Sequence, residues 1–250
     1  FNYSIGVNLK KLTRYLKNPI YHIHRGFTKY LTSRKLGHSL KYVQNSLGPI
    51  HCVYDIGARH GEWSQSIKKI LPSANFFLFE ANEKCKVALA ETGFPFFIAA
   101  LSSASELVDF YSNDSTGDSF FKENTKYYSD VAPVKLQTQS LDDFVESEKI
   151  PQPDFIKLDT QGAELEILKG GSICLKKASL IYMECPIIKY NEGAPNIQEY
   201  LSFMQEADFV PLDICEIHRS HDVLMQIDIL FIRRSKLFQI SPLANDVFRF

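Results

Sequence analysis

The sequence lacks the residue patterns of several protein classes. Its five cysteines are odd in number and scattered, and no C-x-x-C pair exists, so neither a zinc site nor a disulfide framework is indicated. No apolar run approaches the roughly 18 residues that a membrane-spanning helix needs. A signal-peptide core is also missing, although a start at Phe1 rather than methionine leaves targeting open. We therefore expect reduced cysteines and a cytoplasmic protein.

Acidic residues are missing from the first 50 positions, which hold nine lysines and arginines. The remaining positions hold the other 19 basic residues and all 29 acids, so a basic arm precedes an acidic body. Apolar residues recur every three or four positions in the arm, which predicts two or three amphipathic helices with a break near Gly37. The arm could dock on its own body or a second copy, or make the protein membrane-peripheral. A nucleic acid is the least favoured partner, because no signature for one is present.

The rest of the composition is typical of a globular protein, with 45% hydrophobic and 23% charged residues. From residue 50 onward, apolar strands alternate with helices, which predicts an α/β protein with a doubly wound sheet. We expect a helical extension at 1–49, one domain at 50–235 and a C-terminal tail at 236–250. Within the domain, 102–140 reads as an inserted hairpin and loop.

A strand, a glycine turn and a helix start occupy residues 52–62. Gly57 and Gly61 let the backbone turn tightly and approach a ligand, and this order builds a cradle for a nucleotide-type ligand. A dinucleotide would need a second glycine two residues after the first, where this chain has Arg59. Asp55 could instead take an amino group or hydroxyls. An ordinary strand–helix turn is the simpler alternative.

Four acidic residues and one leucine stand at the ends of predicted strands. Ligands of doubly wound sheets bind at the carboxyl ends of the strands. The positions that fall there are Asp55, Glu80, Leu101, Asp159 and Glu184. An acid at Glu80 would commonly hold ribose hydroxyls, whereas a helix cap or a solvated strand end is the alternative. Lys157 lies on a predicted buried strand and is expected to pair with a carboxylate, because an unpaired buried lysine is costly.

The most specific pattern runs from Ile156 to Gly170. It resembles the I-K-x-D-x-E-G-x-E-x-x-x-L-x-G segment of the FkbM family of methyltransferases. Other family pieces follow in order: D-x-G-x-x-x-G at 55–61, F-E-x-x at 79–82, A-A-L-S-S at 99–103, T-Q-S-L-D-D-F at 138–144 and M-E-C-P at 183–186. The resemblance covers roughly residues 50–235 and leaves out the basic arm.

This resemblance implies a class I methyltransferase fold, which is a Rossmann-like doubly wound sheet with an antiparallel last strand. It implies S-adenosylmethionine as cofactor and O-methylation of a small molecule, sugar or glycan. The expected cofactor contacts are Asp55, Gly57, Ala58, Gly61, Glu80, Ala81, Ala100, Leu101 and Asp159. A non-catalytic cofactor-binding module and a nucleic-acid methyltransferase are the alternatives.

Two residues are candidates for catalysis. Asp159 could position the acceptor or take its hydroxyl proton, with a cap on the following helix as an equal alternative. His60 could reach either ligand from the glycine turn, although a solvated loop histidine is the simpler interpretation. Gln161 stands where the family has glutamate, so it keeps hydrogen bonding but loses the charge and any role as a base.

The residues expected to contact the acceptor are Gln161, Glu184, Tyr127, Tyr128 and His218. The loop 112–128 looks like a lid over a sugar ring, although two of its four aromatic side chains could simply anchor it on the core. His218 and His221 lie in a stretch that reads as a polar hairpin loop. A metal site that includes Asp222 is a less favoured alternative there, and we predict no metal.

Overall fold

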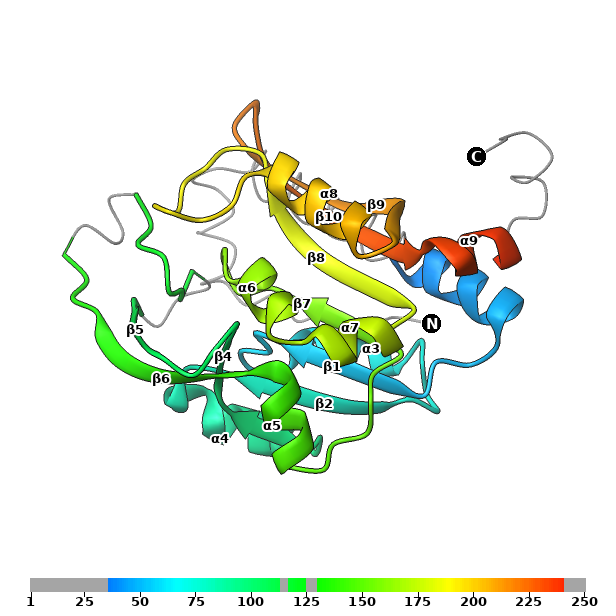
Figure 1. The fold of residues 1–250 in the computed structure, drawn as a ribbon, viewed down its shortest axis with the longest axis horizontal. Coiled ribbons are helices and arrows are strands. Elements are labelled where there is room, and N and C mark those ends of the chain that lie inside the picture. Colours follow the sequence, from blue (N-terminus) through cyan, green and yellow to red (C-terminus); the bar gives the residue numbers. More distant parts are fainter. Residues whose placement is uncertain (1–35, 113–116, 125–129, 241–250) are drawn as a thin grey trace, which may run out of the picture.

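The computed structural model describes residues 36–112, 117–124 and 130–240, and its centre is a seven-stranded sheet (Figure 1). In spatial order the strands are β3 (Phe96–Ile98), β2 (Asn75–Glu80), β1 (Cys52–Ile56), β7 (Phe155–Leu158), β8 (Leu180–Pro186), β10 (Val223–Arg233) and β9 (Phe209–Ser220). Neighbours from β3 to β8 pair in parallel, whereas β10 pairs antiparallel with both β8 and β9. The doubly wound, Rossmann-like sheet with an antiparallel last strand is therefore confirmed.

A second sheet of three strands lies in the order β4 (Ala100–Ser102), β6 (Val134–Ser140) and β5 (Leu107–Phe110). The sequence predicts one continuous strand over 96–101, but the chain changes sheets at Ala99. Residues before it pair with β2, and residues after it pair with β6. This change of partner brings the start of β4 beside the end of β2.

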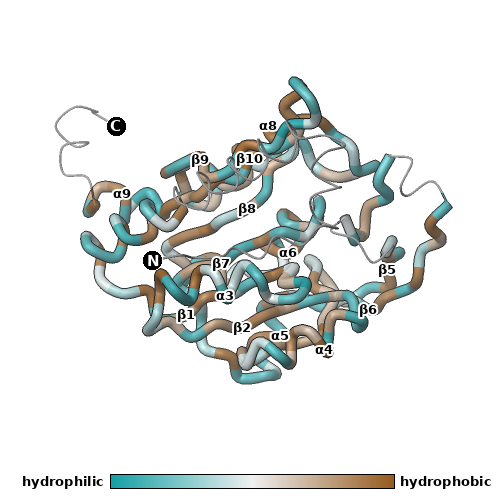
Figure 2. The backbone as a smooth tube through the Cα atoms, turned by 180° about the vertical axis from the view of Figure 1, so that it is seen from behind, coloured by the Kyte–Doolittle hydropathy of each residue, from teal (hydrophilic) through white to brown (hydrophobic). Residues whose placement is uncertain are grey.

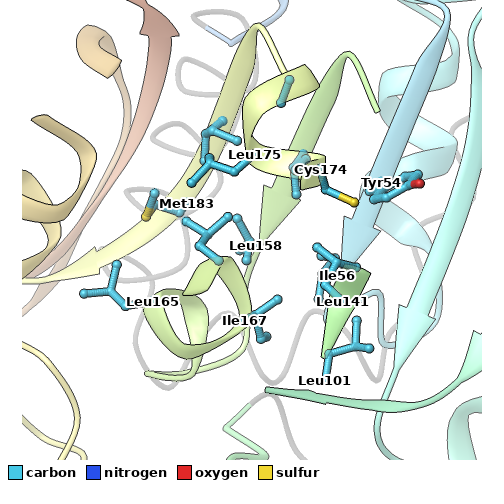
Figure 3. Packing of buried hydrophobic residues seen from close by; sticks show 14 of the residues in the cluster. Tyr54, Ile56, Leu101, Leu141, Leu158, Leu165, Ile167, Cys174, Leu175 and Met183 are labelled. Atoms are coloured by element: carbon cyan, nitrogen blue, oxygen red, sulfur yellow. The ribbon is translucent and has the colours of Figure 1, made fainter. Parts of the chain in front are cut away.

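Helices cover both faces of the main sheet, and each face has its own apolar cluster. One cluster involves α5 (Leu141–Ser147), α6 (Glu164–Lys169), α7 (Ser172–Lys177) and α8 (Ile197–Glu206), and Figure 3 shows part of it. The other involves a helix at 36–47, α3 (Glu62–Lys68), η1 (Glu83–Cys85), α4 (Lys86–Glu91) and α9 (Arg234–Ile240). Neighbouring residues of β1 serve opposite faces, as the alternation of strand side chains requires: Tyr54 joins the first cluster and Val53 the second. In Figure 2, brown hydrophobic stretches follow the central strands.

Local capping explains where two of these helices begin. The Ser140 hydroxyl accepts a hydrogen bond from the Asp143 amide at 3.1 Å, as the sequence predicts for α5. Asn196 and Glu199 form a reciprocal capping box at the start of α8. The short helix α7 is not predicted by the sequence. It has only six residues after the Gly170-Gly171 pair, which is too few to show a helical repeat of apolar positions.

Two elements differ from the sequence-based expectation. The strands β9 and β10 are longer than predicted, so His218 lies inside a strand rather than in a hairpin loop. Gly37 lies within the helix described at 36–47, at the edge of the described residues, so the break expected near it stays a prediction. Its apolar side packs into the core, and the Ser39 hydroxyl donates to Asp213 Oδ2 at 2.7 Å.

Several expectations for the arm and the loop lie outside the described residues. These include the earlier helices of the arm and both Tyr127 and Tyr128. The proposed boundaries at 49 and 235 remain predictions. Within the part of the chain that is described, no helix is both long enough and apolar enough to cross a membrane.

Candidate active site

A cavity of about 220 Å³ opens at the carboxyl ends of β1, β2 and β7, beside the start of β4. The predicted site residues that line it are Gly57, His60, Glu80, Ala81, Leu101, Asp159 and Gln161. Those that do not line it are Asp55, Ala58, Gly61, Ala100, Glu184 and His218. The convergence of strand ends that the sequence indicates is therefore present, although the cofactor contacts themselves remain predictions.

Glycine at position 57 is required by the approach of two strand ends. Gly57 has a φ of +73°, and a Cβ there would lie 2.0 Å from the backbone oxygen of Asp159. The amides of Gly57 and Ala58 both donate to the carbonyl of Phe79, at 2.9 and 3.0 Å. The turn after β1 is thus held against both β2 and β7. A Cβ at Gly61 would lie 2.8 Å from Thr92 Cγ2, so packing against Thr92 also favours glycine there.

Asp55 lies beneath this turn. It is fully buried, its Oδ1 lies 2.9 Å from Lys157 Nζ, and its Oδ2 accepts from the Ser64 hydroxyl at 2.6 Å. Lys157 Nζ also donates to the carbonyl of Gly57 at 2.9 Å. Burial opposes the charge on Lys157, but Asp55 and Asp159 outweigh it and raise the pKa of the ammonium above its ordinary value. The carboxylate partner predicted for Lys157 is therefore Asp55, and Asp55 supports the turn from below.

Glu80 is the acid that faces the cavity at the end of β2. Its Oε2 accepts from the Arg59 amide at 2.7 Å, and its Oε1 accepts from the Asn82 amide at 2.9 Å. Burial raises the pKa of this carboxyl, and the two backbone hydrogen bonds partly offset that effect. Each oxygen keeps further acceptor capacity that two ligand hydroxyls could use.

Two cavity residues near Glu80 were missed by sequence reasoning. Asn82 Nδ2 donates to Asp118 Oδ2 at 2.8 Å, and both residues line the cavity. The sequence signal that could have identified Asn82 is its position in the F-E-x-x segment at 79–82. In the structure, Asn82 also caps η1. Asp118 belongs to the polar loop, and its neighbour Phe120 is half-buried against the core while also lining the cavity. This packing agrees with the anchoring alternative for that aromatic side chain.

Gln161 connects the cavity to the end of β8. Its Nε2 donates to Asp159 Oδ1 at 3.1 Å and to Glu184 Oε1 at 3.0 Å. Its backbone has a left-handed φ of 56°, and its carbonyl accepts from the side chains of Ser119 and Asn191 at 2.8 and 2.7 Å. The amide is therefore held in one orientation between two carboxylates.

The Tyr190 hydroxyl also lies within hydrogen-bonding distance of Glu184, 3.1 Å from its Oε1. Burial and the nearby charges of Asp159 and Asp228 raise the pKa of Glu184 well above its ordinary value. A carboxylate with a raised pKa holds a proton more readily than a solvated one. The sequence predicts that Glu184 contacts the acceptor. The raised pKa of Glu184 depends on its burial in the folded protein, so it could not be predicted from the sequence.

The loop after β7 is clamped by Glu164, which is buried at the start of α6. Its carboxylate accepts from the Thr160 amide at 2.8 Å, from the Gly162 amide at 3.0 Å and from the Tyr200 hydroxyl at 2.5 Å. Glu164 therefore fixes the loop from within. The cap position of α6 is Ala163 and has no side-chain hydrogen bond, so the alternative in which Asp159 caps this helix is wrong.

The two predicted histidines are in different surroundings. His60 lines the cavity and lies 3.5 Å from exposed Glu62, in a position that is compatible with either of its predicted roles. His218 lies away from the cavity, 3.3 Å from Asp228. The alternative metal site that includes His221 and Asp222 is wrong, because these two residues lie in the turn after β9. The carboxylates that lie near His218 are those of Glu216 and Asp228.

Comparisons with known proteins place the sequence in a family. The sequence matches the Methyltransferase FkbM domain over residues 55–211, which is more than half of the chain. It is 23% identical over 226 residues to the 2-O-methyltransferase NoeI of Sinorhizobium fredii, covering 83% of this chain and 92% of that protein. It is 30% identical over 118 residues to the hexuronic acid methyltransferase AglP of Haloferax volcanii, covering 44% of this chain and 47% of that protein.

Among solved structures, methyltransferase FkbM from Methylobacillus flagellatus matches with a TM-score of 0.45 at 14% identity. That match covers 76% of this chain and 47% of the other. The domain match, together with the doubly wound sheet and the cavity at its strand ends, establishes what the chain is. It belongs to the FkbM family of methyltransferases and uses S-adenosylmethionine as its cofactor.

Proposed function

We propose that this protein methylates a hydroxyl group of a sugar or glycan. The observation that carries the proposal is the hydrogen-bonded series Asp159, Gln161 and Glu184 at the edge of the cofactor cavity. The carboxylate and amide oxygens of these three side chains could accept hydrogen bonds from the hydroxyl groups of a ligand bound beside the methyl donor. The names of the two relatives, a 2-O-methyltransferase and a hexuronic acid methyltransferase, support the same chemical class.

The cavity fits the cofactor in its donor set. Glu80, whose oxygens keep acceptor capacity, would hold the ribose hydroxyls. Gly57 lines the cavity, and its lack of a side chain would let the backbone of the turn approach the ligand. Apolar walls from Phe79, Leu101 and Phe120 would exclude water from the bound cofactor. When bound, S-adenosylmethionine supplies a methyl group on a sulfonium centre, which an oxygen nucleophile displaces.

Asp159 is the residue that we assign to the acceptor hydroxyl. It lines the cavity, and its side chain is 45% exposed, so an incoming hydroxyl can reach it. Gln161 cannot take a proton, but its amide orients the Asp159 carboxylate. Glu184 accepts from the same amide and so helps to hold Gln161 in this orientation. Positioning the hydroxyl correctly is expected to supply much of the rate, and proton removal to add to it.

The test is methyl transfer to defined acceptors. The full chain is incubated with S-adenosylmethionine and a panel of oligosaccharides and uronic acids, and O-methyl products are identified by mass spectrometry and NMR. A matched panel with every hydroxyl already methylated is the control. Transfer to nitrogen alone, or to a nucleic acid, would contradict the proposal. Binding of S-adenosylhomocysteine without transfer to any hydroxyl would favour the non-catalytic module instead.

Two further expectations accompany this proposal. The basic arm at 1–49 is proposed to contact a membrane surface or a second copy of the chain, and the protein is proposed to work in the cytoplasm. Residues 1–35 lie outside the described part, so support for the first comes from their charge and apolar spacing alone.

A further inference from the structure

Three side chains with metal-binding chemistry meet on β9 and β10, away from the cofactor cavity. They are Glu216, His218 and Asp228, and one potential ligand atom from each lies within 4.8 Å of the others. Asp228 is directly opposite Glu216 in the antiparallel pairing. Because side chains alternate along a strand, Glu216 and His218 project from the same face of β9. The strand register, and not chain proximity, therefore assembles the cluster.

The cluster contains buried atoms whose hydrogen-bonding needs are unmet. Asp228 is only 9% exposed, and its Oδ2 accepts from the Tyr182 hydroxyl at 2.8 Å. Its other oxygen, Oδ1, lies 3.3 Å from His218 Nε2. The geometry between these two atoms is not that of a hydrogen bond, and among the described residues neither atom has another hydrogen-bond partner. Buried polar atoms without partners are costly, so the arrangement points to a missing ligand.

We propose that Glu216, His218 and Asp228 bind a divalent transition metal such as Zn²⁺ or Mn²⁺. An imidazole nitrogen with two carboxylate oxygens is a donor set that suits these ions. One cation would satisfy both Asp228 Oδ1 and His218 Nε2 and would neutralise the two carboxylates. Three protein ligands would leave coordination positions for water or for an oxygen of a ligand.

The contact from Tyr182 fits this assignment. Residues that bind a metal are normally oriented by hydrogen bonds from a second layer of side chains. The Tyr182 hydroxyl occupies one carboxylate oxygen of Asp228 and leaves the other directed at His218. Tyr182 is buried on β8, so its position is set by the sheet and not by the metal.

This site lies outside the cofactor cavity, and the proposal does not rest on the proposed methyl transfer. None of its three residues lines the cofactor cavity. Glu184 connects the two sites, because it lies opposite Asp228 in the pairing of β8 with β10 and the charge of Asp228 helps to raise its pKa. The competing explanation is a simple ion pair, in which a protonated His218 lies 3.3 Å from Asp228 and 3.6 Å from Glu216.

The experiment is metal titration of the untagged full chain after treatment with a chelator. Calorimetry with ZnCl₂ and with MnCl₂ is expected to show one bound equivalent, with MgCl₂ weaker because it prefers oxygen ligands. His218→Ala should abolish binding, and Tyr182→Phe should weaken it by about 10–100-fold. His221→Ala removes an exposed histidine from the same hairpin and should leave binding unchanged.

NMR of the histidine ring nitrogens supplies a second readout. Metal should shift the His218 signals at neutral pH and leave those of His221 in place. No binding at millimolar metal, or binding that survives His218→Ala, would overturn the proposal. A His218 ring that titrates with pH but does not respond to metal would establish the ion pair instead. Should Tyr182→Phe fail to fold, Asp228→Asn together with the NMR readout decides the matter.

Discussion

The Lys157 ammonium lies 2.9 Å from Asp55 Oδ1, and both side chains are buried. The same ammonium donates to the carbonyl of Gly57, so one cation joins β1, β7 and the turn beside the cofactor cavity. A buried pair of this kind adds little net stability over an apolar pair, but breaking it leaves an uncompensated charge. The pair therefore makes the shape of the turn depend on two buried residues that do not line the cavity.

Replacing Lys157 by methionine should destabilise the fold by about 3–5 kcal/mol, because Asp55 would be left buried without its cation. The measurement is the free energy of unfolding in urea. Lys135→Met is the matched control, since Lys135 pairs with Asp109 on the surface and should cost under about 1 kcal/mol. The double variant Asp55→Asn/Lys157→Met should recover much of the loss. Equal costs for the two lysine variants would contradict this account.

Gly57→Ala should be more harmful than Gly48→Ala. Both glycines have a positive φ, so both substitutions carry the left-handed penalty of about 1–2 kcal/mol. Only at Gly57 would the new Cβ collide with a backbone oxygen of Asp159, whereas at Gly48 nothing lies within 4 Å. The clash should add about 1–3 kcal/mol or more to the loss of unfolding free energy. A similar loss in both variants would show that the strand ends can separate freely.

Glu80→Ala should weaken binding of S-adenosylhomocysteine by about 1–3 kcal/mol, which is roughly 5–150-fold in affinity, because ligand hydroxyls would lose their acceptor. Calorimetry gives the affinity directly. Glu83→Ala is the control, since Glu83 is exposed nearby and pairs with Lys86 on the surface. Unchanged affinity in the Glu80 variant would remove that residue from the cofactor site.

Gln161→Glu should lower stability by about 1–3 kcal/mol at pH 8, because a carboxylate cannot donate to Asp159 and Glu184 and would add a negative charge beside them. The loss should shrink toward pH 5 as protonation relieves the repulsion. Urea unfolding at the two pH values measures both effects. Gln152→Glu changes the charge equally at an exposed loop position and should have little effect. If both variants behave alike, the neutral amide is not required.

The buried carboxyl of Glu164 predicts a pH dependence of stability. Burial raises its pKa above the ordinary 4.5, although hydrogen bonds from Tyr200 and Thr160 act in the opposite direction. A raised pKa means that the folded state holds the proton more tightly than the unfolded state. The resulting stabilisation is therefore present below about pH 4.5 and is lost as the pH rises through the folded-state pKa.

Comparison with Glu164→Gln isolates this effect, because glutamine does not titrate. The stability of the wild type relative to this variant should be greatest near pH 4 and should fall toward pH 7. Urea unfolding at intervals of half a pH unit provides the measurement. A difference that stays constant with pH, or that grows as pH rises, would show that burial does not govern this carboxyl.

Much of the fold and part of the site could be predicted from the sequence because their signals are local. The strand at 75–80 and the helix at 141–147 have the bounds that apolar periodicity and the Ser140 cap indicate. Glycines at a strand end and the pattern at 156–170 were enough to indicate the cofactor class and the family. These features depend on residues a few positions apart, so a linear reading captures them.

The tertiary structure alone decided which polar groups meet. Asp55 was expected to touch the cofactor, yet burial against Lys157 places it beneath the turn. Gln161 spans two carboxylates only because the ends of β7 and β8 are adjacent. His218 meets Asp228 through strand register, although Asp222 is nearer in sequence. Such contacts join residues far apart in the chain, and the burial that sets their pKa values exists only after the sheet has formed.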